Sequence, residues 1–410
     1  MKLLLVHNRY RQPGGEDEVF LRQSELLRSA GHEVLEYTRH NDEIVDGGIL
    51  SKANLAARTL WAWDSVARLR ALLRREKPDL AHFHNTFPLI SPAAYSACQR
   101  EGIPVVQSLH NARLICPAAT FYREGRVCED CLGRFMSWPG IVHACYHNSH
   151  FQTAVVASML AGHRILGTWQ EQVDAYIVFT EFFRQKFVRA GLPREKIFVN
   201  PHFLGTDPGM KQEMGDYALF LGRLAPEKGV LTLLKAWRSL GHVPLQIAGK
   251  GPMERDVEQF AGENSSVCVL PHLSRQECFD LIKGARFLVW PSEGHNETFG
   301  LVAIEAFACG TPVIASRTGA MTEIVEDHKT GLHFTAGDAD DLAAKVHWAW
   351  THPDEMDEMG RTSHAEYKSK YTAEKNYEAL LGIYRKAIEK RSSQKENSLA
   401  VRALMQRYRT

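Results

Sequence analysis

Two glutamates in the second half of the sequence have a spacing that could serve ligand binding. Glu297 and Glu305 are eight positions apart, and they follow the apolar run ARFLVWPS at residues 285–292. A carboxylate repels phosphate but accepts hydrogen bonds from hydroxyl groups. Eight residues make about two turns of a helix, so the two side chains would lie on roughly the same face. The pair predicts a site for sugar or ribose hydroxyls, against the alternative of two solvated surface glutamates.

Two cations stand at a similar place earlier in the same half. In YALFLGRLAPEKG, residues 217–229, Arg223 follows a predicted strand and Lys228 precedes a predicted helix. The arginine fork can hold two phosphate oxygens, and lysine acts as a point charge. These side chains predict a diphosphate site, although two ordinary surface cations would look the same. Gly249 and Gly251, in the later turn IAGKGP, allow a tight chain path that should line the same pocket.

A strand, a loop and a helix should position the glutamates. ARFLVWPS predicts a buried strand, SEGHNETFG a loop, LVAIEAFAC a helix and TPVIAS a second buried strand. Open α/β sheets bind ligands at the carboxyl ends of their strands. The backbone N–H groups at the start of the helix should therefore face the ligand and favour an anion there. These groups belong to Thr298, Phe299, Gly300 and Leu301.

A pair of glycines follows the first predicted strand. Gly14 and Gly15 lie in HNRYRQPGGEDE, between the strand KLLLVH and a helical stretch, where they would let the backbone approach a ligand closely. An ordinary Pro-Gly-Gly turn is the alternative. The loop lacks the G-x-G-x-x-G spacing of dinucleotide-binding proteins, which disfavours a dehydrogenase. Glu16, next to the glycines, could contact an acceptor.

Three histidines lie at the ends of two other predicted strands. His110 ends IPVVQSLH, so its ring should emerge at the carboxyl edge of the sheet. There an imidazole can donate a hydrogen bond to a sugar hydroxyl. A histidine without function in a loop is the alternative, and the strand end favours the functional interpretation. His82 and His84, in DLAHFH, are interpreted as structural.

Four cysteines are clustered in an irregular stretch at residues 116–150. They follow the pattern C-x11-C-x2-C-x13-C and are Cys116, Cys128, Cys131 and Cys145. A C-x2-C pair can place two thiolates on one metal ion, and the outer two cysteines could complete a tetrahedral zinc site. Such a site would be structural because it leaves no open position. Unligated thiols are an equal alternative.

Apolar runs alternate with helical stretches in both halves of the chain. The runs predicted as strands are KLLLVH, HEVLEYT, DLAHFH, IPVVQSLH, AYIVFT and KIFVN, then YALFLGR, VPLQIAG, SVCVLP, ARFLVWPS, TPVIAS and GLHFTAG. This alternation predicts parallel sheets covered by helices on both faces. Residues 201–215 are rich in Gly, Pro and Asp and predict a linker. The expected parts are an N-terminal domain at 1–204, a C-terminal domain at 205–372, a helix at 373–390 and a tail at 391–410.

Residues 49–75 combine tryptophans and leucines with five arginines. Such a basic amphipathic stretch is typical either of a helix packed on a sheet, with a solvated face, or of a helix lying on an anionic membrane. We favour the packed helix, and peripheral membrane contact is the alternative.

Composition excludes several classes of protein. The chain has 410 residues, 44% of them hydrophobic and 24% charged, as expected of a soluble protein with two domains. A net charge of +1 gives no reason to expect a nucleic-acid partner. There is no apolar run of about 18 residues, and the run near the N-terminus is too short for a signal peptide. We therefore expect a cytoplasmic protein, which could also be peripheral to the inner face of the membrane.

The C-terminal motifs are similar to those of a known family. The E-x7-E arrangement in ETFGLVAIEAFACGTPVIAS and the segment GRLAPEKG resemble retaining glycosyltransferases of family 4, and the resemblance covers nearly the whole chain. It implies an α/β fold of the GT-B type: two open parallel-sheet, Rossmann-like domains facing a cleft, with a last helix that crosses back to the N-terminal domain. A nucleotide-sugar donor would bind mainly to the C-terminal domain.

The resemblance also implies roles for individual residues. Glu305 would hold the ribose and Glu297 would lie at the transferred sugar, with His110 beside that sugar. Arg223 and Lys228 would bind the diphosphate. The remaining implied donor contacts are the glycine loop, which faces the sugar-phosphate cleft, the second glycine turn and the helix start, namely Gly14, Gly15, Gly249, Gly251, Thr298, Phe299, Gly300 and Leu301.

The implied activity is sugar transfer of the hexosyltransferase type. A nucleotide diphosphate-sugar would donate to a glycan or lipid-linked acceptor, with retention at the anomeric carbon and in polysaccharide biosynthesis. Catalysis in the family needs no metal cofactor, so zinc would be structural only. Two alternatives stay open: another GT-B enzyme, such as a nucleotide-sugar epimerase or a phosphorylase, and a non-catalytic assembly subunit with a zinc-held cysteine segment. The sequence does not indicate the base, the sugar or the acceptor.

Overall fold

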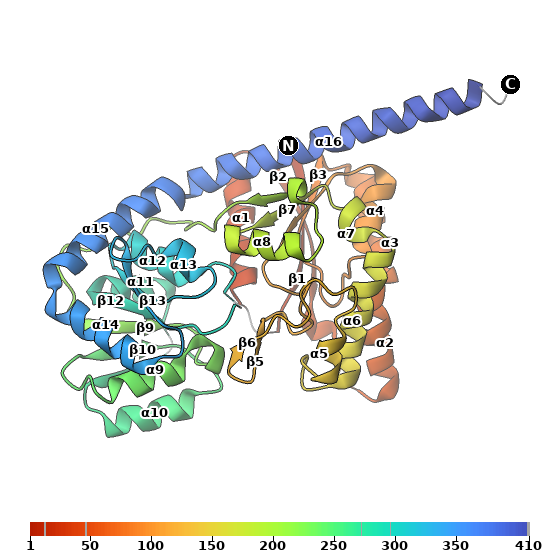
Figure 1. The fold of residues 1–410 in the computed structure, drawn as a ribbon. Helices are drawn as coiled ribbons and strands as arrows, with labels where there is room; N and C mark the ends of the chain where they lie inside the picture. Colours follow the sequence, from red (N-terminus) through yellow and green to blue (C-terminus); the bar gives the residue numbers. More distant parts are fainter. Residues whose placement is uncertain (12–13, 46, 272, 296, 408–410) are drawn as a thin grey trace. The chain divides into compact units, whose positions relative to one another are not determined.

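The computed structural model describes residues 1–11, 14–45, 47–271, 273–295 and 297–407, with side chains of the last helix described as far as residue 393. The chain divides into two units (Figure 1). Unit 1 comprises Met1–Ala119, Glu129–Asn200 and Tyr377–Thr410, and unit 2 comprises Thr120–Cys128 and Pro201–Asn376. Residues 120–128, inside the cysteine-rich stretch, thus group with unit 2.

Unit 1 is built on a parallel sheet. In the described residues its strand order is β2-β1-β3-β4-β7-β8. The first strand carries the run Leu3 to Val6, all of it buried, because helices cover both faces of a parallel sheet. The strand bounds are β1 Lys2–Arg9, β2 Glu33–His40, β3 Leu80–Asn85, β4 Val105–Ser108, β7 Ala175–Val178 and β8 Ile197–Val199.

Helices follow the strands of unit 1. They are α1 Gly15–Ser29, η1 Asn41–Glu43, α2 Ile49–Leu60, α3 Trp63–Glu76, α4 Ala94–Glu101, α5 Trp138–Val142, α6 His150–Ile165, α7 Thr168–Glu171, α8 Glu181–Arg189, η2 Arg194–Lys196 and α16 Ala373–Arg407. The return of the last helix to the N-terminal part is confirmed, since the hydroxyl of Tyr384 in α16 bonds Nδ1 of His82 in β3 at 2.7 Å. The helix continues as far as Arg407, beyond its predicted end at residue 390.

The basic stretch at residues 49–75 forms two helices. α3 packs as expected and buries Ser65, Val66, Leu69 and Leu73. α2 packs against α6, with Thr59 buried and Leu55 and Ala56 half-buried, while its first two residues, Ile49 and Leu50, are exposed. The single packed helix that the sequence predicts is therefore two packed helices, and α2 packs on α6. Helical periodicity alone does not tell which apolar face finds a partner.

Unit 2 repeats this architecture. Among the described residues its parallel sheet has the order β11-β10-β9-β12-β13-β14. The strands are β9 Tyr217–Leu221, β10 Leu245–Ala248, β11 Val267–Leu270, β12 Ala285–Trp290, β13 Val313–Ser316 and β14 Gly331–Phe334. The helices are η3 Pro226–Lys228, α9 Val230–Trp237, α10 Glu254–Glu263, α11 Arg275–Gly284, α12 Leu301–Ala308, α13 Met321–Ile324, α14 Ala339–Thr351 and α15 Pro353–Lys370. A hairpin, β5 Tyr122–Arg123 and β6 Arg126–Val127, also belongs to this unit.

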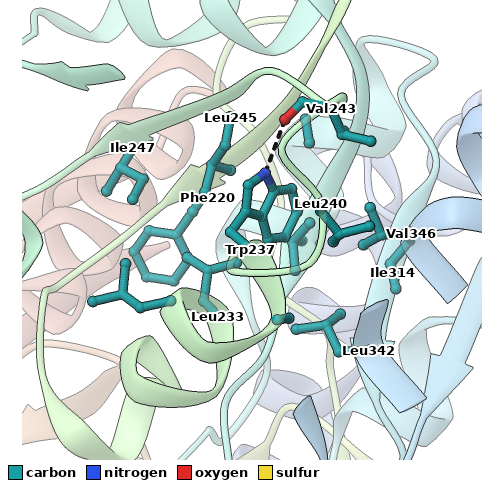
Figure 2. Close-up of a cluster of buried hydrophobic side chains, with 14 of the residues drawn as sticks. Phe220, Leu233, Trp237, Leu240, Val243, Leu245, Ile247, Ile314, Leu342 and Val346 are labelled. Atoms are coloured by element: carbon teal, nitrogen blue, oxygen red, sulfur yellow. Dashed lines mark hydrogen bonds between the residues drawn. The ribbon is translucent and has the colours of Figure 1, made fainter. Parts of the chain in front are cut away.

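The core of unit 2 lies between its sheet and helices α9 and α14 (Figure 2). Trp237 is buried in this cluster, which also contains the strand residues Phe220 and Leu245 and the helix residue Leu342. Its indole N–H donates to the carbonyl of Val243 at 3.0 Å, so the polar atom of this large side chain keeps a partner. The core therefore fixes β9 and β10, the strands whose carboxyl ends carry the predicted cation and glycine loops.

Both sheets reverse their order beside their first strand. In unit 1 the chain runs from β1 outward to β2 and then returns to β3 on the other side of β1. In unit 2 it runs from β9 to β10 and β11 and returns to β12 on the other side of β9. Such reversals are where open α/β sheets bind ligands. Each run predicted as a strand overlaps one of these strands, so the predicted fold class is confirmed.

Candidate functional site

Lys228 and Glu297 form an ion pair at the point of reversal in unit 2. The ammonium of Lys228, at the end of η3, donates to Oε1 of Glu297, in the loop after β12. The hydroxyl of Ser292 donates to the same oxygen at 3.0 Å. Burial acts to raise the pKa of Glu297, but the charge and hydrogen bond of Lys228 hold the pKa below its usual value. Glu297 is therefore an ionised acceptor at neutral pH.

The loops that carry this pair are pressed together through their backbones. Gly229 has a φ of 71°, and a Cβ atom there would lie 1.8 Å from the carbonyl oxygen of Pro291. The backbone N–H of Glu293 donates to the carbonyl of Glu227 at 3.1 Å. Only glycine fits at position 229, since a left-handed backbone and a close approach are required together. The carboxyl ends of β9 and β12 thus form one surface.

The predicted glycine turn closes on the same loop. The backbone N–H of Gly222 donates to the carbonyl of Ala248 at 3.0 Å, and that of Leu224 donates to the carbonyl of Lys250 at 2.9 Å. A Cβ atom at Gly249 would lie 1.8 Å from the carbonyl oxygen of Gly222, and one at Gly251 would lie 2.2 Å from that of Leu224. The predicted tight chain path is confirmed, and it brings the loop after β10 against the loop that holds Arg223, which is exposed.

The loop after β12 opens a helix, as predicted. Thr298 and Phe299 precede Gly300, which is the N-cap of α12, and Leu301 is the first helical residue. The expectation that Glu297 and Glu305 share a helical face is wrong, because residues 297–300 are not helical. Glu305 lies in the second turn of α12 and is half-buried. Loop geometry, rather than helical spacing, sets the relation between the two carboxylates.

Sequence reasoning missed a third carboxylate in this part of unit 2, beside Glu297 and Glu305. Glu293, also in the loop after β12, accepts a hydrogen bond from the hydroxyl of Thr232. Burial raises the pKa of Tyr122 in the hairpin, and the charges of Glu293 and Glu227 raise it further. Glu293 could have been found as an acidic residue at a strand end. Tyr122 could not, because only the tertiary fold brings the hairpin there.

His110 in unit 1 is held by another histidine. Its Nε2 lies 3.0 Å from Nδ1 of His84, and the two rings stack with centroids 5.1 Å apart. One nitrogen of this pair must donate and the other accept, so the contact fixes the orientation of His110. His84 was predicted to be structural, whereas the structure places it against the predicted functional residue. The signal was available: both residues end neighbouring parallel strands.

His82 has the structural role that was predicted. Its Nδ1 and Nε2 bond the hydroxyls of Tyr384 and Ser108, at 2.7 and 2.9 Å. Burial lowers the pKa of His82 to about 3, so the ring is neutral. It ties α16 to the sheet of unit 1, and it takes no proton at physiological pH.

The glycine loop leads into a half-buried carboxyl group, that of Glu16. Gly14 is the N-cap of α1 and Gly15 its first residue, and the N–H of Gly14 donates to Asp17 at 2.9 Å. The carboxylate of Glu16 accepts from the amide of Asn111 at 2.6 Å and from the hydroxyl of Tyr10 at 3.1 Å. Burial raises the pKa of Glu16 above its usual value. Because Asn111 follows His110, the structure brings Glu16 and His110 to one edge of the sheet.

The cysteines give a different result. Cys128 belongs to unit 2, while Cys116, Cys131 and Cys145 belong to unit 1. In the part of the chain that the structure describes, His, Cys, Asp and Glu side chains form no group of three or more that could hold a metal ion. The zinc site stays a prediction from the cysteine spacing. Across the same residues, no helix is both long and apolar enough to cross a membrane.

Comparisons with known proteins agree with this architecture. A family model described as Glycosyltransferase Family 4 matches residues 13–207, and one described as Glycosyl transferases group 1 matches residues 208–365. A D-inositol 3-phosphate glycosyltransferase of Acidothermus cellulolyticus is 27% identical over 82% of this chain and 74% of its own length. A D-rhamnosyltransferase of Pseudomonas aeruginosa is 29% identical over 38% of this chain and 42% of its own.

An uncharacterized glycosyltransferase of Methanocaldococcus jannaschii is 34% identical over 35% of this chain and 41% of its own length. The chain thus spans about two-fifths of the length of this relative and of the rhamnosyltransferase. Among solved structures, sucrose-phosphate synthase from Thermosynechococcus elongatus gives a TM-score of 0.67 at 17% identity, over 94% of this chain and 98% of the other. HepE of Anabaena in complex with UDP gives a TM-score of 0.65 at 16% identity, over 96% of this chain and 100% of the other. These structures share the fold.

Proposed function

The chain belongs to the group 1 glycosyltransferases of family 4, and on this premise we propose that it transfers a sugar from a nucleotide diphosphate-sugar to an acceptor hydroxyl. Unit 2 would hold the donor and unit 1 the acceptor. The observation that carries the proposal is the Lys228–Glu297 pair, in the loops where the order of the second sheet reverses. It joins a cation suited to phosphate with an ionised acceptor suited to hydroxyls.

The residues of unit 2 can divide the donor between them. An ammonium group has three N–H donors, and Glu297 takes one, so Lys228 can bind phosphate oxygens without releasing its partner. Arg223 would add a bidentate contact, and the N–H groups at the start of α12 would add partial positive charge. Negative charge that develops on the leaving diphosphate is thereby stabilised, which should be the largest contribution to the rate. We propose that these groups do the work of a divalent metal ion.

Glu297 would orient the transferred sugar, and Glu305 the ribose. An acceptor-only carboxylate selects hydroxyl donors, and the lowered pKa of Glu297 keeps it in that state. In unit 1, His110 would donate to a hydroxyl of the sugar, with His84 fixing its ring. Glu16 and Asn111 lie at the same sheet edge and are placed to contact the acceptor.

We propose retention at the anomeric carbon by a front-side reaction. The bond from the anomeric carbon to the acceptor oxygen forms on the face from which the bond to the phosphate oxygen breaks. The acceptor proton passes to the leaving phosphate oxygen. A double displacement would need a carboxylate nucleophile, and His110 is not one. Polysaccharide synthesis at the inner face of a membrane is the setting we propose for this reaction, and a zinc ion on the four cysteines would be structural.

Thermal unfolding in the presence of UDP, GDP, ADP, CMP or dTDP tests the proposal. A ligand that binds only the folded protein adds about 2.7 kcal/mol of stability at a hundredfold excess over its dissociation constant. We expect a clear shift with one diphosphate, and UDP is the first candidate because the similar HepE structures contain UDP or UDP-glucose. The shift should persist in EDTA, and EDTA alone should lower stability if zinc is bound. No shift with any nucleotide would contradict the proposed function.

A further inference from the structure

Unit 1 contains a large cavity between α2, α6 and the turn after β3. Its volume is about 730 Å³, within the usual range of small-molecule sites, roughly 300 to 1,000 Å³. α2 contributes Leu55 and Ala56, α6 contributes Val155 and Val156, and the turn after β3 contributes Phe87. These side chains make an apolar interior, which suits an apolar part of a ligand and accounts for an amphipathic helix that does not pack on the sheet.

The charged side chains that the structure describes in the lining of this cavity are cationic. Its described lining includes Arg11, Lys52 and Arg113, and it includes no Asp or Glu. Arg11 lies 3.8 Å from the exposed Asp42 and is thereby partly neutralised. Lys52 is exposed, and the guanidinium of Arg113 stacks 4.5 Å from the centre of the Phe87 ring. A ligand with an anionic group beside an apolar part is therefore favoured.

The cavity adjoins a second, smaller one at the edge of the sheet where His110 lies. A smaller cavity, of about 50 Å³, is lined by His110 and Asn111. Phe87 and Arg113 line both cavities. These two side chains therefore lie between the large cavity and the residues proposed to bind the acceptor.

Apolar surface continues from the cavity to the outside. Val45 and Phe151 line it and are exposed, and Ile49 and Leu50, in the first turn of α2, are 86% and 87% exposed. Scattered apolar side chains are ordinary on a protein surface, whereas a group of them around a cavity indicates a binding site. A chain longer than the cavity would lie across this rim.

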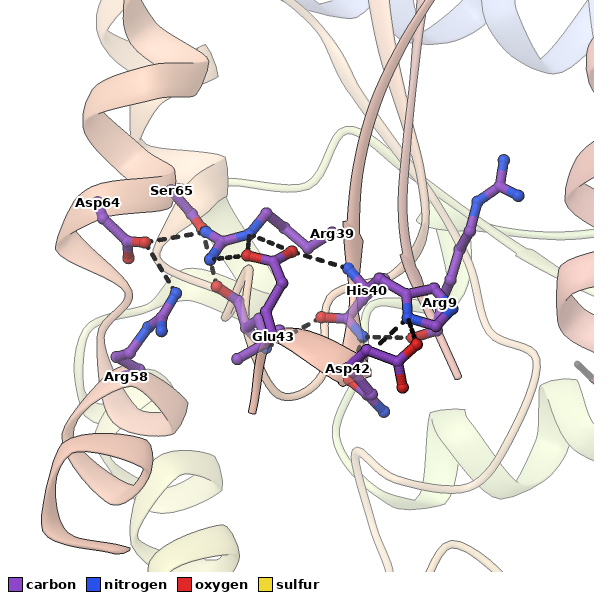
Figure 3. Close-up of polar contacts among 11 residues, drawn as sticks. Arg9, Arg39, His40, Asp42, Glu43, Arg58, Asp64 and Ser65 are labelled. Carbon is purple, nitrogen blue, oxygen red and sulfur yellow. Dashed lines mark hydrogen bonds and ion pairs between the residues drawn. The ribbon is translucent and has the colours of Figure 1, made fainter. Parts of the chain in front are cut away.

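Ion pairs hold the wall of the cavity in place without a ligand (Figure 3). Arg39, at the end of β2, is buried and donates to Glu43 of η1 at 2.9 Å and to Asp64 of α3 at 2.9 Å. Asp64 also accepts from Arg58 of α2 at 2.8 Å. Burial alone would lower the pKa of Arg39, but these carboxylates raise it above its usual value. These contacts tie η1, α3 and the C-terminal turn of α2 to one another beside the cavity.

We propose that this cavity binds the hydrocarbon chain of a lipid-linked acceptor, with an acceptor phosphate held by Lys52 and Arg113. The inference rests on the proposed function, and it selects the lipid-linked class over a free glycan. The sugar or phosphate end of such a molecule would point past Phe87 to His110. A free glycan would leave the apolar interior without a partner.

Equilibrium dialysis of labelled farnesyl diphosphate with the full chain, below the micelle concentration of the probe, tests the proposal. Inorganic diphosphate has the charge without the chain, and farnesol has the chain without the charge. We expect farnesyl diphosphate to bind at least tenfold more tightly than either. Lys52→Glu should weaken the binding of farnesyl diphosphate at least threefold and leave the binding of farnesol unchanged.

A matched pair of variants on α2 locates the probe. Ala56→Trp fills the cavity and should weaken the binding of farnesyl diphosphate at least tenfold. Ala57→Trp changes the next residue, which is exposed, and should alter this affinity less than twofold. Equal effects of the two, equal binding of inorganic diphosphate, or no binding of farnesyl diphosphate would overturn the inference. The thermal shift with a nucleotide, measured on the same proteins, reports on the proposed function separately. A shift in Ala56→Trp equal to that of the wild type also shows that the variant is folded.

Discussion

The ion pair between Lys228 and Glu297 allows a quantitative test of the candidate donor site. The two side chains are 26% and 14% exposed, which places the pair between surface and buried cases. Surface pairs contribute up to about 1 kcal/mol, and removing one partner of a buried pair costs about 3–5 kcal/mol. We expect Lys228→Met to lower the free energy of unfolding of unit 2 by about 2 kcal/mol, because it leaves a carboxylate shielded from water without its cation.

Glu297→Gln should lower the free energy of unfolding less than Lys228→Met does. The double variant should lower it by less than the sum of the two single losses. Glu297→Gln keeps an oxygen that can accept from Ser292, so a loss of about 1 kcal/mol is expected. Since the two side chains contact each other, the double variant should reveal a coupling of about 1 kcal/mol. Both single variants should also lose most transferase activity while remaining folded.

Urea unfolding of the four proteins at pH 7 supplies the numbers. A chain with two units can unfold in more than one step, so the step that moves with added nucleotide diphosphate is assigned to unit 2. Additive losses, with a coupling below about 0.3 kcal/mol, would show that the two side chains do not hold each other. Near-normal turnover in both single variants would refute their assignment to the donor site.

The same geometry predicts four further outcomes. Arg223→Ala should weaken nucleotide diphosphate binding at least tenfold in calorimetry and leave the melting temperature unchanged, because Arg223 is exposed; a fall in stability without a loss of affinity would give it a structural role. Gly229→Ala should lower the melting temperature strongly, since its Cβ would overlap Pro291, whereas Gly14→Ala, in open space, should have a small effect. His84→Phe should lower kcat and leave the nucleotide-induced thermal shift unchanged, because it removes the bond that orients His110; unchanged kcat would contradict a positioning role. The pKa of Glu16 is raised in the folded protein, so its contribution to stability is present below pH 4.5 and is lost as pH rises through the raised value. Glu16→Gln should therefore gain stability relative to wild type between pH 4.5 and 8. Thermal unfolding of both proteins across that range checks the sign.

The sequence was sufficient for the fold because each strand is a local apolar run between polar breakers. It also placed Arg223, Lys228, Gly249 and His110 at strand ends, and a parallel sheet brings such ends to one edge. It could not give the partner of Lys228, because Glu297 is 69 positions away and the contact depends on β12 returning beside β9. The error over Glu305 came from extending the helix backward through residues that are not helical.

The role of α2 was the hardest to predict, for a physical reason. Its apolar periodicity is the same whether its apolar face meets a sheet, a ligand or a membrane. The neighbouring helix α3 differs in buried surface rather than in pattern, as the burial of Leu69 and Leu73 shows. What distinguishes α2 is the arrangement around it. η1 and α3 are tied together through Arg39, and the helix between them packs on α6 and lines a cavity. The fold thus ties the C-terminal end of that helix to α3 through Arg58 and Asp64 and leaves Leu55 and Ala56 at the cavity, which is the arrangement a site for a hydrocarbon chain requires.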